Sequence, residues 1–279
     1  MTALVNFLLR MKHLKNRGPK SFIEHKQYLY DIVKLKLWFI WTWKQNHSEE
    51  PVSHILRERV DIYRKTDINK ELLQAVNLRF DDPEWKTIEQ RITELYGKHQ
   101  SDDDAAKFEE EAFQVVQPTI EVRALRDFEE PAYVLDFKCG SLTYEPPKPE
   151  APDCVQIHIA NAIAPRSIFD DKKYLLDCFR SLLDGCTRDY NVDSFWTETW
   201  LNSYPKWLEY FPEEWTDNMS EPDKDVMWHF GFWGQFITSR GVFNHRLGNQ
   251  LRETGVFPFS PRSSRCRVEV MREHIEKMY

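Results

Sequence analysis

The sequence lacks most of the short motifs that reveal a protein's chemistry. Only nine of its 279 residues are glycine, and the chain has no Walker loop, dinucleotide-binding fingerprint or Gly-x-Ser-x-Gly elbow. Its five cysteines are an odd number without a Cys-x-x-Cys pair, which argues against a disulfide framework and a zinc ribbon. Because the chain also lacks a His-Glu-x-x-His pair and an aspartate-rich calcium loop, no metal is expected.

Segments for export or membrane insertion are also lacking. Residues 1–10 have no positive charge before their apolar core, and no small-residue cleavage site follows, so a secretory signal is not expected. The apolar stretch 37–43 is far shorter than the roughly 20 residues that cross a membrane. We therefore expect a cytoplasmic protein. Peripheral membrane contact of the basic N-terminal segment is the less favoured alternative to packing of this segment against the rest of the chain.

Charge is unevenly distributed along the chain. Residues 1–44 contain nine lysines and arginines against two acidic residues, whereas the whole chain carries 38 basic and 45 acidic residues. A basic N-terminal segment therefore precedes an acidic body. The acidic body disfavours general nucleic-acid binding, so we expect no nucleic-acid partner and look instead for a small-molecule or anionic ligand.

The first part of the chain is predicted to be helical. Ser21 is a plausible N-cap with Glu24 three residues later, and residues 22–43 follow without glycine or proline. Further helices are predicted at 52–63, 69–77 and 82–96, where apolar residues recur at helical spacing.

The second part of the chain is predicted to mix strands with helices. An acidic stretch at 101–111 indicates a boundary, so we place a helical part at 1–115 and a second domain at 116–279. Short alternating or apolar runs predict strands at 113–117, 119–123, 133–137, 155–159 and 195–200, and capping residues predict a helix at 169–183. The fold class expected is α+β, with a helical N-terminal part followed by a mixed α/β domain.

Three motifs follow one another in the second part. They are Ile157-His-Ile, Thr199-Trp-Leu-Asn-Ser-Tyr-Pro and Phe211-Pro-Glu-Glu-Trp-Thr-Asp-Asn-Met. Their order resembles a group of two-part bacterial acyltransferase-domain proteins, whose motifs are Ile-His-Ile, Ser-Trp-Leu-Leu-Asp-Pro and Pro-x-x-Ser-Asn-Ile. The resemblance implies a GNAT-like fold for the second domain. It also implies that the protein is acyltransferase-like and takes an acyl group from a coenzyme A thioester to a small acceptor.

Three residues are candidates for the chemistry of acyl transfer. A general base must reach the proton of the attacking amine, and His158 is the best candidate because alternation turns it away from Ile157 and Ile159. Tyr204 or Tyr144 is a candidate acid. The alternative for His158 is a structural, hydrogen-bonded and half-buried histidine.

Tryptophan and arginine side chains are the candidate ligand-binding groups. Six of the ten tryptophans lie between residues 195 and 233, where they build either a core or the wall of a pocket. Residues 240–272 contain seven arginines and no lysine, and arginine suits bidentate binding of phosphate or carboxylate. We expect residues 258–267 to form an arginine-rich loop, in which neighbouring arginines lower the pKa of the Cys266 thiol. The candidate ligand-binding residues are Trp200, Trp228, Trp233, Arg246, Arg262, Arg265 and Arg267.

Two functions remain open from the sequence. The first is an acyltransferase-like enzyme, and the second is a non-catalytic GNAT-like protein that binds an anionic partner through its aromatic and arginine-rich surface. A split between adjacent parallel strands with free backbone N–H groups favours the enzyme. A groove filled by the chain's own tryptophans favours the binding protein.

Overall fold

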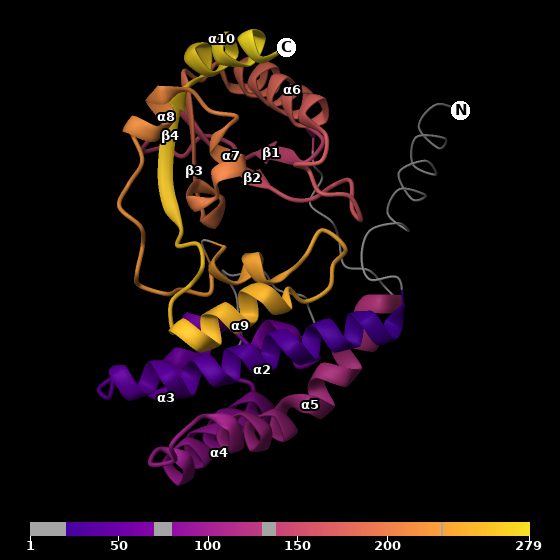
Figure 1. Cartoon of the computed structure of the whole chain (residues 1–279), viewed down its shortest axis with the longest axis vertical. Helices are drawn as coiled ribbons and strands as arrows, with labels where there is room; N and C mark the ends of the chain where they lie inside the picture. Colours follow the sequence, from indigo (N-terminus) through magenta and orange to yellow (C-terminus); the bar gives the residue numbers. More distant parts are fainter. Residues whose placement is uncertain (1–20, 70–79, 130–137, 230) are drawn as a thin grey trace.

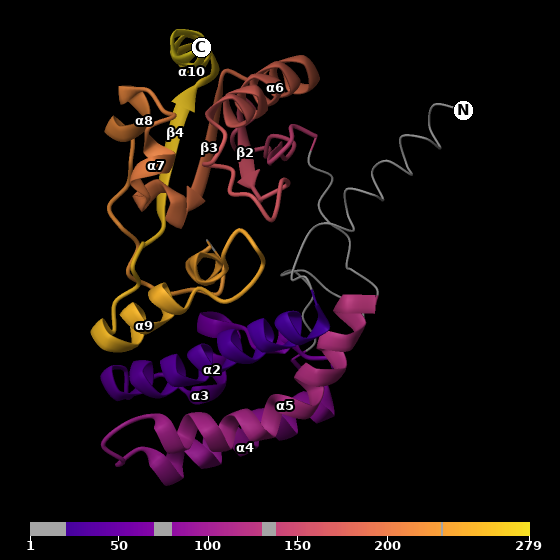
Figure 2. The ribbon, with the colours of Figure 1, turned by 45° about the vertical axis from the view of Figure 1, so that its right-hand side comes forward.

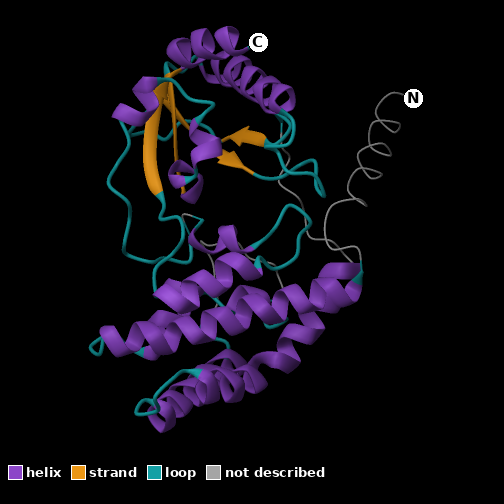
Figure 3. Cartoon of the chain, viewed as in Figure 1, coloured by secondary structure: helices purple, strands orange, loops and turns teal. Residues whose placement is uncertain are grey.

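The computed structural model describes residues 21–69, 80–129, 138–229 and 231–279. These residues form a mixed α+β structure, with long helices at one end and a small sheet packed against helices at the other (Figures 1 and 3). The expected α+β class is confirmed at this level. Among the residues described, the structure has no helix that combines the length and the apolar character needed to span a membrane.

The helical half is built around the long antiparallel pair of α2 and α5 (Figure 2). The side chain of Ser21 accepts a hydrogen bond from the backbone N–H of Glu24, so the predicted cap at the start of α2 is confirmed. Pro83 occupies the first turn of α4, where its missing N–H leaves no helical hydrogen bond unmade. The helical elements of this half are α2 (Phe22–Asn46), α3 (Val52–His54), the π-helix η1 (Ile55–Val60), the 3-10 turn η2 (Tyr63–Lys65), α4 (Pro83–His99) and α5 (Ala106–Glu129).

The strands predicted at 113–117 and 119–123 are wrong, because both segments lie inside α5. Their apolar side chains alternate over short stretches, but the same side chains also recur at helical spacing. Phe113, Val116, Ile120 and Ala124 are buried together in the helical core. The helix therefore passes through residue 115 and ends at Glu129. The strand predicted at 133–137 and most of the helix predicted at 69–77 lie outside the described residues.

The sheet has four strands in the order β1-β2-β3-β4. The outer pairs are antiparallel, whereas β2 and β3 are parallel and are joined by the crossover helix α6. This confirms the strands predicted at 155–159 and 195–200, apart from Trp200, and it confirms a helix in the region predicted at 169–183. That helix begins three residues later than predicted and continues through Gly185 to Tyr190. The elements are β1 (Leu142–Tyr144), β2 (Cys154–Ile159), α6 (Lys172–Tyr190), β3 (Ser194–Thr199), η4 (Trp200–Ser203), α7 (Pro205–Leu208), α8 (Glu213–Asp217), β4 (Arg262–Arg267) and α10 (Val268–Met278).

The arginine-rich segment predicted as a loop is instead β4, which pairs along the whole length of β3. Its small residues Ser264 and Cys266 are buried, while Arg265 and Arg267 are exposed. Such alternation is the pattern of a strand with one covered face. The prediction failed because serine and arginine are not typical strand residues, and pairing with β3 overrides their weak preference.

One face of the sheet is covered and the other is open. Val155, Ile157 and Phe195 pack with Phe179 of α6 and Met271 of α10 in a single apolar core. Residues that alternate with these core residues remain half-buried or exposed and define the open face. They are Gln156, His158, Trp196, Glu198 and Arg265.

The chain returns to the helical half after the third strand. Residues 226–257, which contain η5 (Phe232–Phe236) and α9 (His245–Thr254), contribute side chains to the core formed by α2 and α5. Trp233 donates from Nε1 to the carbonyl oxygen of Arg59 at 2.8 Å, and Arg252 makes two hydrogen bonds to Glu109. Both halves of the molecule therefore contain residues from the 116–279 portion of the chain.

Candidate functional site

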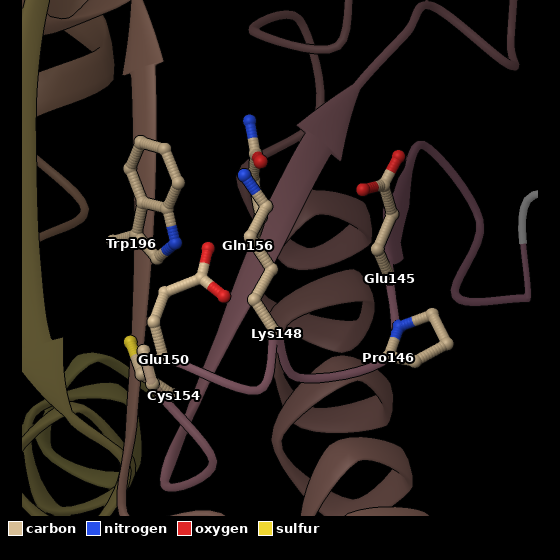
Figure 4. Close-up of a pocket in the computed structure, with 8 residues that line it drawn as sticks. Glu145, Pro146, Lys148, Glu150, Cys154, Gln156 and Trp196 are labelled. Atoms are coloured by element: carbon tan, nitrogen blue, oxygen red, sulfur yellow. The ribbon is translucent and has the colours of Figure 1, made fainter.

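The parallel strands β2 and β3 pair over only half of their length. Their ladder joins residues 154–156 to residues 194–196, while β2 continues to Ile159 and β3 to Thr199. The two ribbons diverge beyond Gln156 and Trp196 (Figure 4). In the described structure, residues 157–159 pair only with β1 and residues 197–199 only with β4. The split exposes inner strand edges whose backbone N–H and C=O groups have no strand partner among the described residues.

His158 and Glu198 stand on the two diverging segments. They share the open face with Gln156 and Trp196, because side chains alternate along a strand and the ladder places Gln156 opposite Trp196. Nε2 of His158 lies 2.9 Å from Oε1 of Glu145, which is an ion-pair distance, but the two atoms do not have the geometry of a hydrogen bond. Burial, with a smaller contribution from Asp223, raises the pKa of Glu198. The split therefore has a candidate base on one side and a carboxyl group with a raised pKa on the other.

Tyr144 does not share this site. It lies opposite Ile157 in the ladder of β1 and β2, so its side chain is on the covered face, away from His158. The hydroxyl donates to Oδ2 of Asp189 at 2.7 Å, and burial raises the pKa of Tyr144 well above its usual value. The prediction that Tyr144 acts with His158 is wrong, because the side chains of the two residues lie on opposite faces of the sheet.

Tyr204 and Trp200 belong to an aromatic cluster beyond the end of β3. The ring of Tyr204 lies 5.3 Å from that of Phe169 and 5.3 Å from that of Phe259. The ring of Trp200 packs against two members of this cluster, 6.0 Å from Tyr204 and 5.7 Å from Phe259. The chain's own aromatic rings thus fill the space past the carboxyl end of β3.

Trp228 and Trp233 pack in the helical half, although Gly231 and Gly234 of the same segment lie against Trp200. The guanidinium carbon of Arg64 lies 3.4 Å from the ring centroid of Trp228, and Trp233 is buried against Phe39 and Phe257. The structure therefore divides the three predicted tryptophans between two places. Dense spacing in the sequence did not translate into one pocket, because residues 226–257 leave the sheet half.

The predicted arginines are also divided. On β4, Arg262 donates from Nε to the carbonyl oxygen of Ser220 at 2.6 Å, and Arg267 forms an ion pair with Glu214 at 2.8 Å. Arg265 is the more available of the three, since its side chain is 60% exposed and lies 3.8 Å from Asp153. The fourth, Arg246, is exposed on α9 in the helical half. The hydrogen bond of Arg262 to a backbone carbonyl and the ion pair of Arg267 explain the positions of both side chains without a ligand.

Cys266 is not an activated thiol. It is buried on the covered face of β4, and burial, aided by Glu214, raises its pKa to about 12. Arg267 lowers this pKa, but burial outweighs its effect, so the expected net lowering by neighbouring arginines is wrong. Side chains that are adjacent in a strand point to opposite faces, so Arg265 and Arg267 stand on the other side of the sheet.

A hollow of about 190 Å³ lies on the open face beside the split. Its floor contains Cys154, Gln156 and Trp196, and its wall is the proline-rich loop at residues 145–151 (Figure 4). None of these residues was predicted from the sequence to be a binding group. Alternation along β2 could have placed Gln156 on the same face as His158. The position of Trp196 could not have been found in this way, because it depends on the parallel pairing of β2 with β3.

Comparison with models of protein families, with curated proteins and with solved structures finds no match for this chain. The GNAT-like fold and the acyltransferase activity implied by the resemblance therefore stay predictions. Within the described residues, no group of three or more histidine, cysteine, aspartate or glutamate side chains is arranged to hold a metal ion.

Proposed function

We propose that the protein is acyltransferase-like and binds a coenzyme A thioester at the split between β2 and β3. The observation that carries this proposal is the half-length pairing of the two strands. Unpaired strand edges bind extended ligands through backbone hydrogen bonds. The pantetheine arm of coenzyme A suits such an edge, because it is a flexible chain with two amide groups.

The residues on the open face suit the chemistry of acyl transfer. His158, which lies beside Glu145, takes the proton of an attacking amine as the amine nitrogen bonds to the thioester carbonyl carbon. The carbon–sulfur bond then breaks, and the departing thiolate takes a proton from Glu198, whose pKa is raised by burial. Tyr204 stays the alternative donor. The products are an amide and free coenzyme A.

The first test is binding. A ligand that binds only the folded protein at 100 times its Kd stabilises it by about 2.7 kcal/mol, so coenzyme A and acetyl-CoA should raise the melting temperature saturably. Turnover is followed by the release of coenzyme A thiol to Ellman's reagent, which the buried cysteines of the native protein should not obscure.

The second test separates catalysis from binding. His158→Gln should keep the thermal shift and lose turnover. His54→Gln is the matched control, because His54 forms a similar ion pair with Glu50, 2.6 Å away, on the surface of the helical half. Absence of any shift at millimolar acetyl-CoA, or turnover that survives His158→Gln unchanged, would contradict the proposal.

A second candidate function is non-catalytic anion binding. Asp171 caps α6 by accepting from the N–H of Tyr174, with Asp170 beside it, so the start of this helix repels a pyrophosphate group and offers no site for the pyrophosphate of coenzyme A. An anion would instead bind at Arg265, which is exposed and only loosely paired. This function predicts that pyrophosphate binds the wild type, binds Arg265→Gln more weakly and binds the Arg246→Gln control normally, with no thioester turnover.

A further inference from the structure

The hollow on the open face is built around the half-buried ring of Trp196. Cys154 and Gln156 complete its floor, and the loop at 145–151 forms a wall with two carboxylates, Glu145 and Glu150. Glu150, Lys148 and Trp196 point toward one another across the hollow (Figure 4). Its volume of about 190 Å³ suits a small headgroup better than a large cofactor.

The chain already places an ammonium group in this hollow. Nζ of Lys148 lies 5.9 Å from the ring centroid of Trp196, within the range of a cation–π contact. Lys148 is exposed and stands in a surface loop, where its backbone forms an isolated bridge with Ala151. A flexible, solvent-exposed side chain can leave the ring at little cost, so Lys148 acts as a tethered occupant that a free ligand can replace.

The charges around the hollow favour a cation after Lys148 leaves. Glu145 and Glu150 line it, and Glu145 is also paired with His158. The opposing charge is Arg265, which lies across from Trp196 in the ladder of β3 and β4 and within 3.8 Å of Asp153. With Lys148 displaced, the charged groups that line the hollow are the two carboxylates of Glu145 and Glu150, and Arg265 nearby is partly offset by Asp153.

We propose that this hollow binds a primary alkylammonium group in exchange for the side chain of Lys148. Trp196 supplies a π face, Glu150 supplies the countercharge and Gln156 supplies an amide oxygen that can accept an N–H of the ligand. A primary ammonium uses all three, whereas a quaternary ammonium has no N–H to donate to Gln156. The site does not depend on thioester binding and takes its ligand whether or not the chain is an enzyme.

The probe is n-butylammonium, with n-butanol as an uncharged analogue of similar length and tetramethylammonium as a cation without N–H donors. Binding is followed by the indole N–H signals of the 15N-labelled protein, and Trp196→Phe assigns the signal of Trp196. Titrations are run at one fixed ionic strength, because surface charge pairing is sensitive to salt. Four proteins are compared: the wild type, Lys148→Gln, Glu150→Gln and the control Glu94→Gln, which alters an exposed carboxylate on α4.

The expected result is a saturable shift of the Trp196 signal with n-butylammonium. Lys148→Gln should bind n-butylammonium about three- to tenfold more tightly. In the wild type the Lys148 ammonium competes with the ligand and lowers its apparent affinity, and the variant lacks this competitor. Glu150→Gln should bind at least about threefold more weakly, and Glu94→Gln should match the wild type.

Three results would overturn the proposal. They are no saturable shift with Lys148→Gln, equal binding of n-butanol, and equal binding by Glu150→Gln and the wild type. Tighter binding of tetramethylammonium than of n-butylammonium would also overturn the assignment to primary amines. None of these measurements uses a thioester, so this proposal and the acyltransferase proposal can fail separately.

Discussion

Lys36 provides a direct test of how the helical core is held together. It lies on α2 with only 5% of its surface exposed, and its Nζ donates to the carbonyl oxygen of Asp61 at 3.3 Å. The same Nζ is 5.3 Å from the ring centroid of Trp233, which belongs to the segment that returns from the sheet half. Burial lowers the pKa of Lys36 from 10.5 to about 7, and Lys65 adds to this effect while Asp61 opposes it.

The lowered pKa of Lys36 makes stability depend on pH. The unfolded chain binds a proton at Lys36 up to pH 10.5, whereas the folded protein releases it near pH 7. Since the unfolded state binds more protons between these values, the free energy of unfolding rises with pH across that window. With one pKa unit equal to about 1.4 kcal/mol, the whole shift corresponds to about 5 kcal/mol, of which about 2 kcal/mol is recovered between pH 7 and pH 9.

Lys36→Met should remove this dependence. Methionine has a similar length and no charge, so the variant should be more stable than the wild type at pH 7 by a few kcal/mol. The difference between the two proteins should shrink by about 2 kcal/mol by pH 9. Urea unfolding followed by circular dichroism at pH 7, 8 and 9 gives both free energies, and contributions from other titrating groups cancel in the difference.

Lys34→Met is the matched control on the same helix. Lys34 is partly exposed and pairs with Glu110 at 3.3 Å, so its removal should change stability by less than about 1 kcal/mol and leave the pH slope intact. The reasoning is refuted if Lys36→Met is less stable than the wild type at pH 7, or if the difference between the two does not shrink as the pH rises.

Further predictions concern single side chains elsewhere in the structure. Gly97→Ala should stabilise the protein by about 0.4–1 kcal/mol, because its new methyl group meets open space on α4, whereas Gly185→Ala should cost about 1–3 kcal/mol, because its methyl group would lie 2.6 Å from the hydroxyl of Tyr144. Thermal and urea unfolding measure both, and equal effects of the two substitutions would contradict the packing at α6. Cys266 should resist iodoacetamide at pH 8 in the native protein and react after unfolding, as mass spectrometry of the labelled peptide would show; rapid native labelling would refute its raised pKa of about 12. Ser21→Ala should lower the free energy of unfolding by about 1 kcal/mol through loss of the α2 cap, and no loss would mean that water satisfies the freed N–H equally well.

Local signals in the sequence located several elements correctly. The cap at Ser21, the first-turn Pro83 and the apolar run at 155–159 each act on their own neighbours, so each could be recognised without knowledge of the rest of the fold. The placement of His158 on the opposite side of β2 from Ile157 followed from alternation alone. These features depend on interactions within one segment.

Features that depend on a partner segment were missed. Residues 113–123 alternate enough to suggest strands, but packing against α2 makes them part of a helix. The segment at 262–267 has no strand preference of its own, and the edge of β3 imposes one. For the same reason Tyr144 could not be assigned to the covered face from its sequence, since its orientation depends on its register with Ile157.

The sequence by itself determined the α+β class, the capped helices, the central strands and the residue types available for chemistry. Only the tertiary structure decided that β2 and β3 diverge, that His158 and Glu198 stand on their separating ends, and that Trp196 meets the loop carrying Lys148. The physical reason is the distance along the chain over which each interaction acts. Capping and alternation act over a few residues, whereas strand register, burial and the pKa of a buried group depend on segments far apart in the chain.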